Sequence, residues 1–188
     1  MMKILKKVLL VVAFMLLSLL LLGFYGHYAD SKKAEYGLGS DKEGWKRLSY
    51  EGVSISYPPD WEKFKTPVGE AMHSPDKSAF INLMLVPRQG PLIAQTDERT
   101  LKLQYEASLS YKEANVQTFE KTEINGAEAI TAVIVATEAR APKDTELIYY
   151  ALIRRGNNAV MLQCLCKEKE RQTFEATFKQ VVDSITAK

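Results

Sequence analysis

Hydrophobic and polar positions divide the chain into three parts. An uncharged and strongly apolar run occupies 8–26, a polar stretch with three glycines follows over 30–44, and alternating and helical patterns continue to the end. Long apolar runs are typical of membrane helices, and polar glycine-containing stretches are typical of linkers. We therefore predict a signal anchor, a single transmembrane helix, over 1–29, a flexible tether over 30–44 and a folded domain over 45–188.

The apolar run is long enough to cross a lipid bilayer. As an α-helix its 19 residues rise about 28 Å, and the hydrocarbon core of a bilayer is roughly 30 Å thick. Lys3, Lys6 and Lys7 precede the run and no acidic residue does, so the positive-inside rule predicts a cytoplasmic N-terminus and an extracytoplasmic domain. We expect a single-pass anchor in the cell membrane that begins at about Val8 and ends at about Tyr28.

Cleavage of this run as a signal peptide is the alternative, and it would give a secreted domain. A signal-peptide cleavage site needs small residues at both its −3 and its −1 position. The residues at the end of the run, GFYGHYAD, provide no such pair. Phe24, Tyr25 and Tyr28 are instead typical of an aromatic belt at a membrane surface. No cysteine directly follows the run, which excludes a lipoprotein anchor. The uncleaved anchor is therefore the favoured prediction.

The first half of the domain predicts a hairpin, a covered strand and a helix. Apolar residues alternate with serine over 53–57, which indicates one strand of a hairpin, and two prolines end it. Leu101, Tyr105 and Leu109 recur every four residues, which indicates one face of a helix. The hairpin is expected over 45–57, a strand that is apolar on both faces over 78–86, and the helix over 96–114.

The second half predicts four strands and a final helix. Asn125-Gly126 is a strong two-residue hairpin turn, and the two central strands carry apolar residues on both faces. An unbroken apolar stripe from Phe174 to Ile185 predicts the helix. The strands are expected over 115–124, 127–137, 146–155 and 159–167, and the helix over 168–186. This order of elements predicts an α+β fold, an antiparallel sheet covered by helices.

Several of these features together resemble a known family. The segment GVSISYPPDW over 52–61, the middle helix, the turn at Asn125-Gly126 and the final helix are similar to bacterial PsbP-like and DcrB-like domains. The resemblance spans roughly 45–186 and implies an α/β/α sandwich. It also implies a non-enzymatic role, because known members are accessory subunits, chaperones or partner-binding modules. Many bacterial relatives are lipoproteins, and this chain departs from them by lacking the anchoring cysteine.

Cys164 and Cys166 lie two residues apart on one predicted strand and therefore share a face. A redox pair or half of a metal site is one interpretation, but a disulfide at this spacing would be strained and few further ligands exist. Small residues of the core are the favoured interpretation, since free cysteine often has that role. We therefore predict two core thiols.

His73 is the only candidate general base of the domain, and a Cys–His or Ser–His pair would use it. An ordinary histidine at the end of a strand is the favoured interpretation. For His27, beside the apolar run, we favour a solvated residue. The remaining candidates are pairs of neighbouring charged residues, and we favour their interpretation as solvent-exposed residues on element surfaces or strand ends. Arg154 and Arg155 could also bind an anionic group together. The acidic pairs are Asp97 with Glu98, Glu120 with Glu123, and Glu168 with Glu170.

Composition narrows the function classes. The formal net charge is +2, and setting aside the three N-terminal lysines leaves 22 basic against 23 acidic residues, so no basic surface for DNA or RNA is expected. Nucleotide-binding, EF-hand and zinc-protease motifs are missing from the sequence. We expect a non-enzymatic domain, without cofactor, metal or predicted site residues, that binds a partner protein or assists a membrane complex. A small-ligand or lipid-binding module is the alternative, and a cysteine-based redox module is a weaker one.

Overall fold

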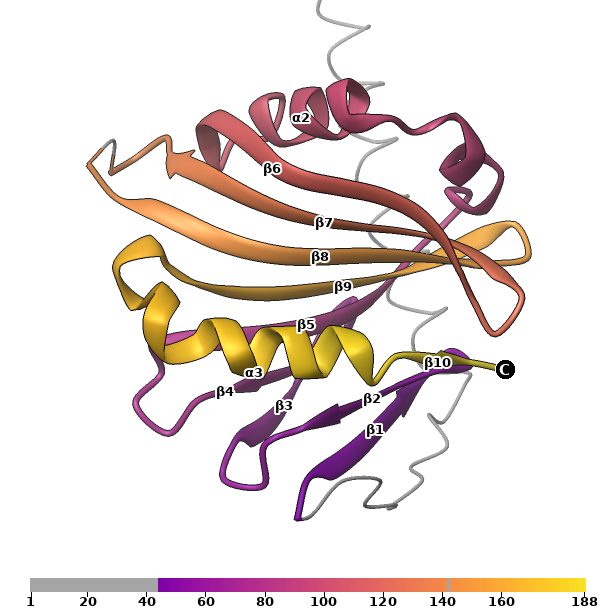
Figure 1. The fold of residues 1–188 in the computed structure, drawn as a ribbon, viewed down its shortest axis with the longest axis horizontal. Helices are drawn as coiled ribbons and strands as arrows, with labels where there is room; N and C mark the ends of the chain where they lie inside the picture. Colours follow the sequence, from indigo (N-terminus) through magenta and orange to yellow (C-terminus); the bar gives the residue numbers. More distant parts are fainter. Residues whose placement is uncertain (1–43, 142) are drawn as a thin grey trace, which may run out of the picture. The chain divides into compact units, whose positions relative to one another are not determined.

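Seven antiparallel strands form the main sheet, in the spatial order β3-β4-β5-β9-β8-β7-β6 (Figure 1). A computed structural model describes residues 44–141 and 143–188. The main sheet consists of β3 (Glu62–Thr66), β4 (Gly69–His73), β5 (Ala79–Val86), β6 (Tyr111–Ile124), β7 (Ala127–Glu138), β8 (Thr145–Arg155) and β9 (Asn158–Lys167). A smaller antiparallel sheet, in the order β1-β2-β10, consists of β1 (Lys46–Tyr50), β2 (Val53–Tyr57) and β10 (Thr186–Ala187).

Two layers cover the main sheet from opposite sides. The helix α3 (Arg171–Asp183) and the smaller sheet pack on one side, which we call the α3 face. The 3-10 helix η1 (Gly90–Gln95) and the helix α2 (Glu98–Glu106) pack on the other side, the α2 face (Figure 1). This arrangement confirms the predicted α+β class, in which helices cover an antiparallel sheet.

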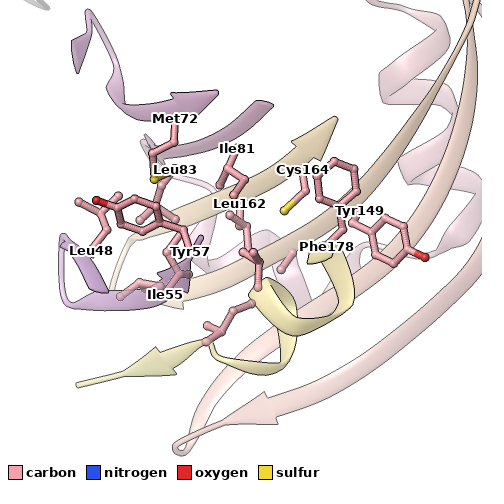
Figure 2. Close-up of a cluster of buried hydrophobic side chains, with 14 of the residues drawn as sticks. Leu48, Ile55, Tyr57, Met72, Ile81, Leu83, Tyr149, Leu162, Cys164 and Phe178 are labelled. Atoms are coloured by element: carbon pink, nitrogen blue, oxygen red, sulfur yellow. The ribbon is translucent and has the colours of Figure 1, made fainter. Parts of the chain in front are cut away.

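Each face of the main sheet has its own buried core. Figure 2 shows the core of the α3 face, where side chains from the main sheet, the smaller sheet and α3 meet. Burial of both faces explains why the central strands carry apolar side chains on both sides. Every side chain of such a strand leaves water when the protein folds. The α3-face core includes Leu48, Ile55, Tyr57, Met72, Ile81, Leu83, Tyr149, Leu162, Cys164 and Phe178.

The hairpin turns follow the sequence closely. Asn125 and Gly126 have φ of 52° and 78°, and Glu51 and Gly52 have φ of 48° and 76°. Two consecutive residues with positive φ match the right-handed twist of the flanking strands, which is why Asn-Gly is so common in two-residue hairpins. The predicted hairpin over 45–57 is confirmed as β1 and β2, and the predicted strand over 78–86 is confirmed as β5.

The helix predicted over 96–114 is wrong in its second half. Asp97 caps the start of α2 by accepting a 2.7 Å hydrogen bond from the Thr100 backbone N–H, but the helix ends at Glu106. The chain then turns and enters β6 at Tyr111, and the long pairing of β6 with β7 outweighs the local helical pattern. Leu109, which the pattern placed on the apolar face, is 96% exposed in the turn.

Replacing Leu109 with serine therefore tests this correction. Since the side chain is almost fully exposed, we expect Leu109→Ser to change the free energy of unfolding by less than about 0.5 kcal/mol. Urea denaturation of the full-length protein, followed by tryptophan fluorescence, measures the change. A loss above about 2 kcal/mol would instead indicate a leucine buried on a continuing helix.

The final segment also differs from the helix predicted over 168–186. It begins with the single 3-10 turn η2 (Glu168–Glu170), and α3 ends at Asp183. The Ser184 hydroxyl donates to the Val181 carbonyl at 2.7 Å and accepts from the backbone N–H of Ser56 at 2.8 Å. This contact joins the end of α3 to β2, and the last residues then pair with β2 as the strand β10.

Besides η2 and β10, which replace the two ends of the predicted final helix, the prediction also missed β3, β4 and η1. The strands β3 and β4 carry Lys63, Lys65 and Glu70 among few apolar residues, so their sequence does not alternate as a half-buried strand usually does. They form because β4 pairs with β5 along its whole length and β3 pairs with β4. The pairing of neighbouring strands decided these elements, and local periodicity did not.

The predicted anchor over 1–29 and almost all of the tether over 30–44 lie outside the described residues. Within 44–141 and 143–188, no helix has the length and apolar character needed to cross a membrane.

Candidate interaction surface

The layer on the α2 face covers only part of the main sheet. The elements of this layer, η1 and α2, pack mainly against β6, β7, β8 and β9. At the other end of the same face, Phe64 of β3 is 40% exposed and Phe80 of β5 is 37% exposed. Large apolar side chains that stay this exposed on the face of a sheet are typical of an interaction surface when they lie together.

The strand register brings these side chains together. Phe64 lies opposite Ala71 on β4, and His73 lies between Glu62 on β3 and Phe80 on β5. Residues opposite each other on neighbouring strands share a face of the sheet. The ring centroids of Phe64 and His73 are 5.6 Å apart, and those of His73 and Phe80 are 6.3 Å apart. We call Phe64, His73 and Phe80 the aromatic surface.

Apolar side chains continue the aromatic surface toward the covered part of the sheet. Leu165 of β9 lies opposite Phe80, and Met84 of β5 lies opposite Met161 of β9. Leu165, Met84 and Met161 are half-buried, and Leu165 and Met161 pack against the core of the α2 face. The surface is therefore contiguous with that core.

The imidazole of His73 is held in place within the aromatic surface. Its Nδ1 donates to the Ser74 carbonyl at 2.8 Å, since a carbonyl oxygen only accepts. Its Nε2 lies 3.7 Å from Glu62 Oε2 at the solvent-facing edge. His73 is the last residue of β4, which agrees with the interpretation as a strand-end histidine.

A tight loop fixes the hairpin that carries His73 and Phe80. The Asp76 carboxylate accepts hydrogen bonds from the Ser74 hydroxyl at 2.5 Å and from the Ser78 hydroxyl at 2.8 Å. These hydrogen bonds, from Ser74 first and from Ser78 next, lower the pKa of Asp76 to about 2. The loop between β4 and β5 therefore holds two residues of the aromatic surface at a fixed separation.

The two cysteines lie on the α3 face, opposite the aromatic surface. Cys164 pairs with Ile81 and Tyr149, and both thiols are free and buried in the core of that face. Burial raises the pKa of both thiols, that of Cys166 to about 12. The fold therefore places His73 and the cysteines on different faces, and the prediction of two core thiols is confirmed.

We expect both thiols to be inert in the native protein. A thiol reacts as its thiolate, and burial disfavours the charged form while it also blocks access. Ellman's reagent should therefore modify neither cysteine of the folded full-length protein on a time scale of minutes, and both in urea. Rapid reaction of one thiol under native conditions would contradict this expectation and revive the redox interpretation.

Most of the other sequence candidates have structural partners. Arg154 Nη1 lies 2.6 Å from Glu128 Oε2, and Arg155 Nε donates to the Glu51 carbonyl at 3.2 Å. Arg171 Nε lies 2.9 Å from Glu168 Oε1. Asp97 caps α2, and Glu98 is the first residue of that helix. Glu120 and Glu123 are exposed on β6, and Glu170 directly precedes α3. Among the described residues, no group of three or more His, Cys, Asp or Glu side chains is placed to hold a metal ion.

The phenylalanines of the aromatic surface were not found from the sequence. Phe64 stands alone between two lysines, and Phe80 belongs to a strand that is apolar on both faces, which suggested full coverage. The only available signal was that isolated phenylalanine in a charged segment. Its meaning depends on which part of the face stays uncovered, and the packing of η1 and α2 decides this.

Comparisons with known proteins place the fold. No family model matches the chain, and no curated protein matches it. The solution structure of cyanobacterial PsbP (CyanoP) from Synechocystis sp. PCC 6803 is similar, with a TM-score of 0.60 at 13% identity over 80% of this chain and 99% of that chain. The crystal structure of the Saccharomyces cerevisiae Ran-binding protein Mog1p has a TM-score of 0.53 at 12% identity, over 76% of this chain and 95% of that chain. The described domain therefore has a PsbP-like fold.

Proposed function

We propose that this chain is a membrane-anchored, extracytoplasmic and non-enzymatic domain that binds a partner protein through the aromatic surface. The uncovered apolar part of the α2 face is the observation that carries the proposal. Protein interfaces have cores enriched in aromatic residues and methionine, and a few such residues supply most of the binding free energy. Phe64 and Phe80 have this character, and Met84 and Met161 extend it.

The energy available at this surface is sufficient for a specific contact. Full burial of one phenylalanine side chain contributes about 1.5–3 kcal/mol, and the two exposed rings are already partly buried. Ring contacts with His73 hold both phenylalanines in one orientation, so little side-chain freedom is lost on binding. The similarity of the fold to a protein named as Ran-binding supports a protein-binding role.

The apolar run over 8–26 supports the anchored location. A partner in or near the same membrane would meet a tethered domain at a high effective concentration, so a modest surface suffices. A test of the anchor is extraction of isolated membranes with alkaline carbonate. The full-length protein should stay with the lipid and retain residues 1–29, whereas a cleaved form would be released without them.

Site-specific photo-crosslinking tests the aromatic surface. A photoreactive phenylalanine derivative is placed at Phe80, and in a second protein at Leu103, which is also exposed but lies on α2. In intact membranes we expect the probe at position 80 to capture one protein reproducibly, and the probe at position 103 not to capture it. The double variant Phe64→Ala, Phe80→Ala should lose this partner by at least about tenfold.

Capture of the same proteins from both positions, or of none, would contradict the proposal. Circular dichroism of each variant confirms that the domain is folded. Because Phe64 and Phe80 are partly exposed, their replacement is expected to leave most of the core intact.

A further inference from the structure

The strand β3 lies at the edge of the main sheet beside the aromatic surface. Among the described strands it pairs with β4 on one side and with none on the other. An edge strand presents backbone N–H and C=O groups of alternate residues that can pair with an added strand. The short strand β3, over Glu62–Thr66, therefore offers a place for one more strand directly next to Phe64.

The two sides of β3 have different chemistry. Phe64 is in register with Ala71 and, through it, with Asn82, and so lies on the α2 face within the aromatic surface. Lys63 and Lys65 alternate with Phe64 and point to the α3 face, in register with Met72 and Glu70. A strand added here would meet one exposed ring on one side and two ammonium groups on the other.

The charge on the α3-face side of this edge is positive. Lys63 Nζ lies 3.4 Å from Glu70 Oε2, and Glu70 is buried, so this pair is largely satisfied within the domain. Lys65 is exposed beside this pair, so the three side chains together carry one net positive charge. Lysine on an edge strand hinders pairing with neutral or basic strands, and an acidic strand turns the same lysine into an attraction.

Resting on the proposed function, we infer that the partner binds as an extended segment that adds a strand to the free edge of β3. The segment has alternating residues. Its apolar side chains lie on the α2 face against Phe64, and its acidic side chains lie on the α3 face near Lys65. Backbone hydrogen bonds give this mode of recognition its strength, and the alternating side chains give it specificity.

Two synthetic peptides test the inference on the full-length protein in a mild detergent. The first is fluorescein-labelled Glu-Val-Glu-Phe-Glu-Val-Glu, and the second carries lysine in place of every glutamate. Fluorescence anisotropy measures both affinities. We expect the acidic peptide to bind at least about tenfold more tightly than the lysine peptide, because Lys65 and Lys63 attract glutamates and repel lysines at the same positions.

A charge reversal on the protein separates strand addition from general attraction. Lys65→Glu should weaken binding of the acidic peptide about fivefold and strengthen binding of the lysine peptide. The matched control is Lys112→Glu on β6, an exposed lysine on the opposite edge strand of the main sheet, which should change neither affinity by more than about twofold. Phe64→Ala should weaken binding of both peptides.

Backbone methylation identifies the pairing itself. In a strand pair only alternate residues direct their N–H toward the partner strand. Two acidic peptides are made, each N-methylated at one alternate set of residues. One of them should bind as the parent does, and the other should lose binding.

Equal binding of the acidic and lysine peptides, no effect of Lys65→Glu, or equal effects of both methylation patterns would each overturn the inference. Dimerisation of the protein that blocks binding of the acidic peptide and is lost in Lys65→Glu would assign the edge to a second copy and would also overturn it. If crosslinking from position 80 still captures a partner while the peptides fail, the aromatic surface stands and only the strand addition is wrong.

Discussion

Replacement of Phe178 by alanine is expected to lower the free energy of unfolding by about 3–5 kcal/mol. Phe178 is fully buried between α3 and the main sheet (Figure 2). Its ring stacks on Phe174 with centroids 6.0 Å apart and contacts Tyr149 at 5.8 Å. Truncation removes these contacts and leaves a cavity that the sheet cannot close, because α3 is fixed at its C-terminal end by Ser184.

This loss is a large part of the whole stability. Domains of this size unfold with a free energy of about 5–15 kcal/mol, so the variant would lose between about a fifth and all of its stability. Urea denaturation followed by the fluorescence of Trp61, whose ring lies 6.1 Å from that of Phe174, measures it. The matched control is Gln180→Ala, an exposed residue of the same helix, which should change stability by less than about 0.5 kcal/mol. A comparable loss in both variants would contradict this explanation, because alanine has the highest helix propensity and Gln180→Ala removes no buried side chain.

The second large effect is expected from Gly69→Ala, which should cost about 3 kcal/mol. A Cβ atom at Gly69 would lie 2.1 Å from the Leu83 carbonyl oxygen and 2.8 Å from Met84 Cα, both backbone atoms of β5. Because backbone cannot move aside as a side chain can, β4 and β5 would have to separate at this position. Phe64, His73 and Phe80 depend on this pairing, so the aromatic surface should be disturbed as well.

Hydrogen exchange of the backbone amides measures this local effect. We expect amides of β3 and β4 to lose protection in Gly69→Ala, while those of β7 and β8 keep it. The control is Val68→Ala in the turn directly before β4, where the side chain is 48% exposed and little should change. Unchanged protection in β4 would mean that the two strands accommodate the methyl group, and the close approach would then have no energetic consequence.

Short stretches of the sequence were enough to predict several features of the fold. Asn125-Gly126 forms a turn with two positive φ angles because those residues tolerate them, whatever surrounds the hairpin. The alternation in β7 and β8 predicted a sheet buried on both faces, and the spacing of Cys164 and Cys166 predicted a shared face. These predictions succeeded because they concern a single strand and its two sides.

The failures concern how elements meet. The helical spacing of Leu101, Tyr105 and Leu109 continued past the true end of α2, since a local pattern carries no information about the strand that takes over at Tyr111. β3 was missed because its place comes from pairing with β4, which itself pairs with β5. The helix was predicted to continue to Thr186, but that residue instead pairs with Ser54 on β2, 132 positions earlier in the chain.

The aromatic surface is the clearest example of this division. The sequence determined that Phe64 and Phe80 are apolar and that their strands alternate. Only the tertiary structure decided that they stay exposed, because η1 and α2 extend over β6 to β9 and leave the β3 end of that face open. Periodicity reports that a side chain points toward one face of a sheet. How far the covering layer reaches across that face depends on contacts between segments far apart in the chain, and these exist only in the folded molecule.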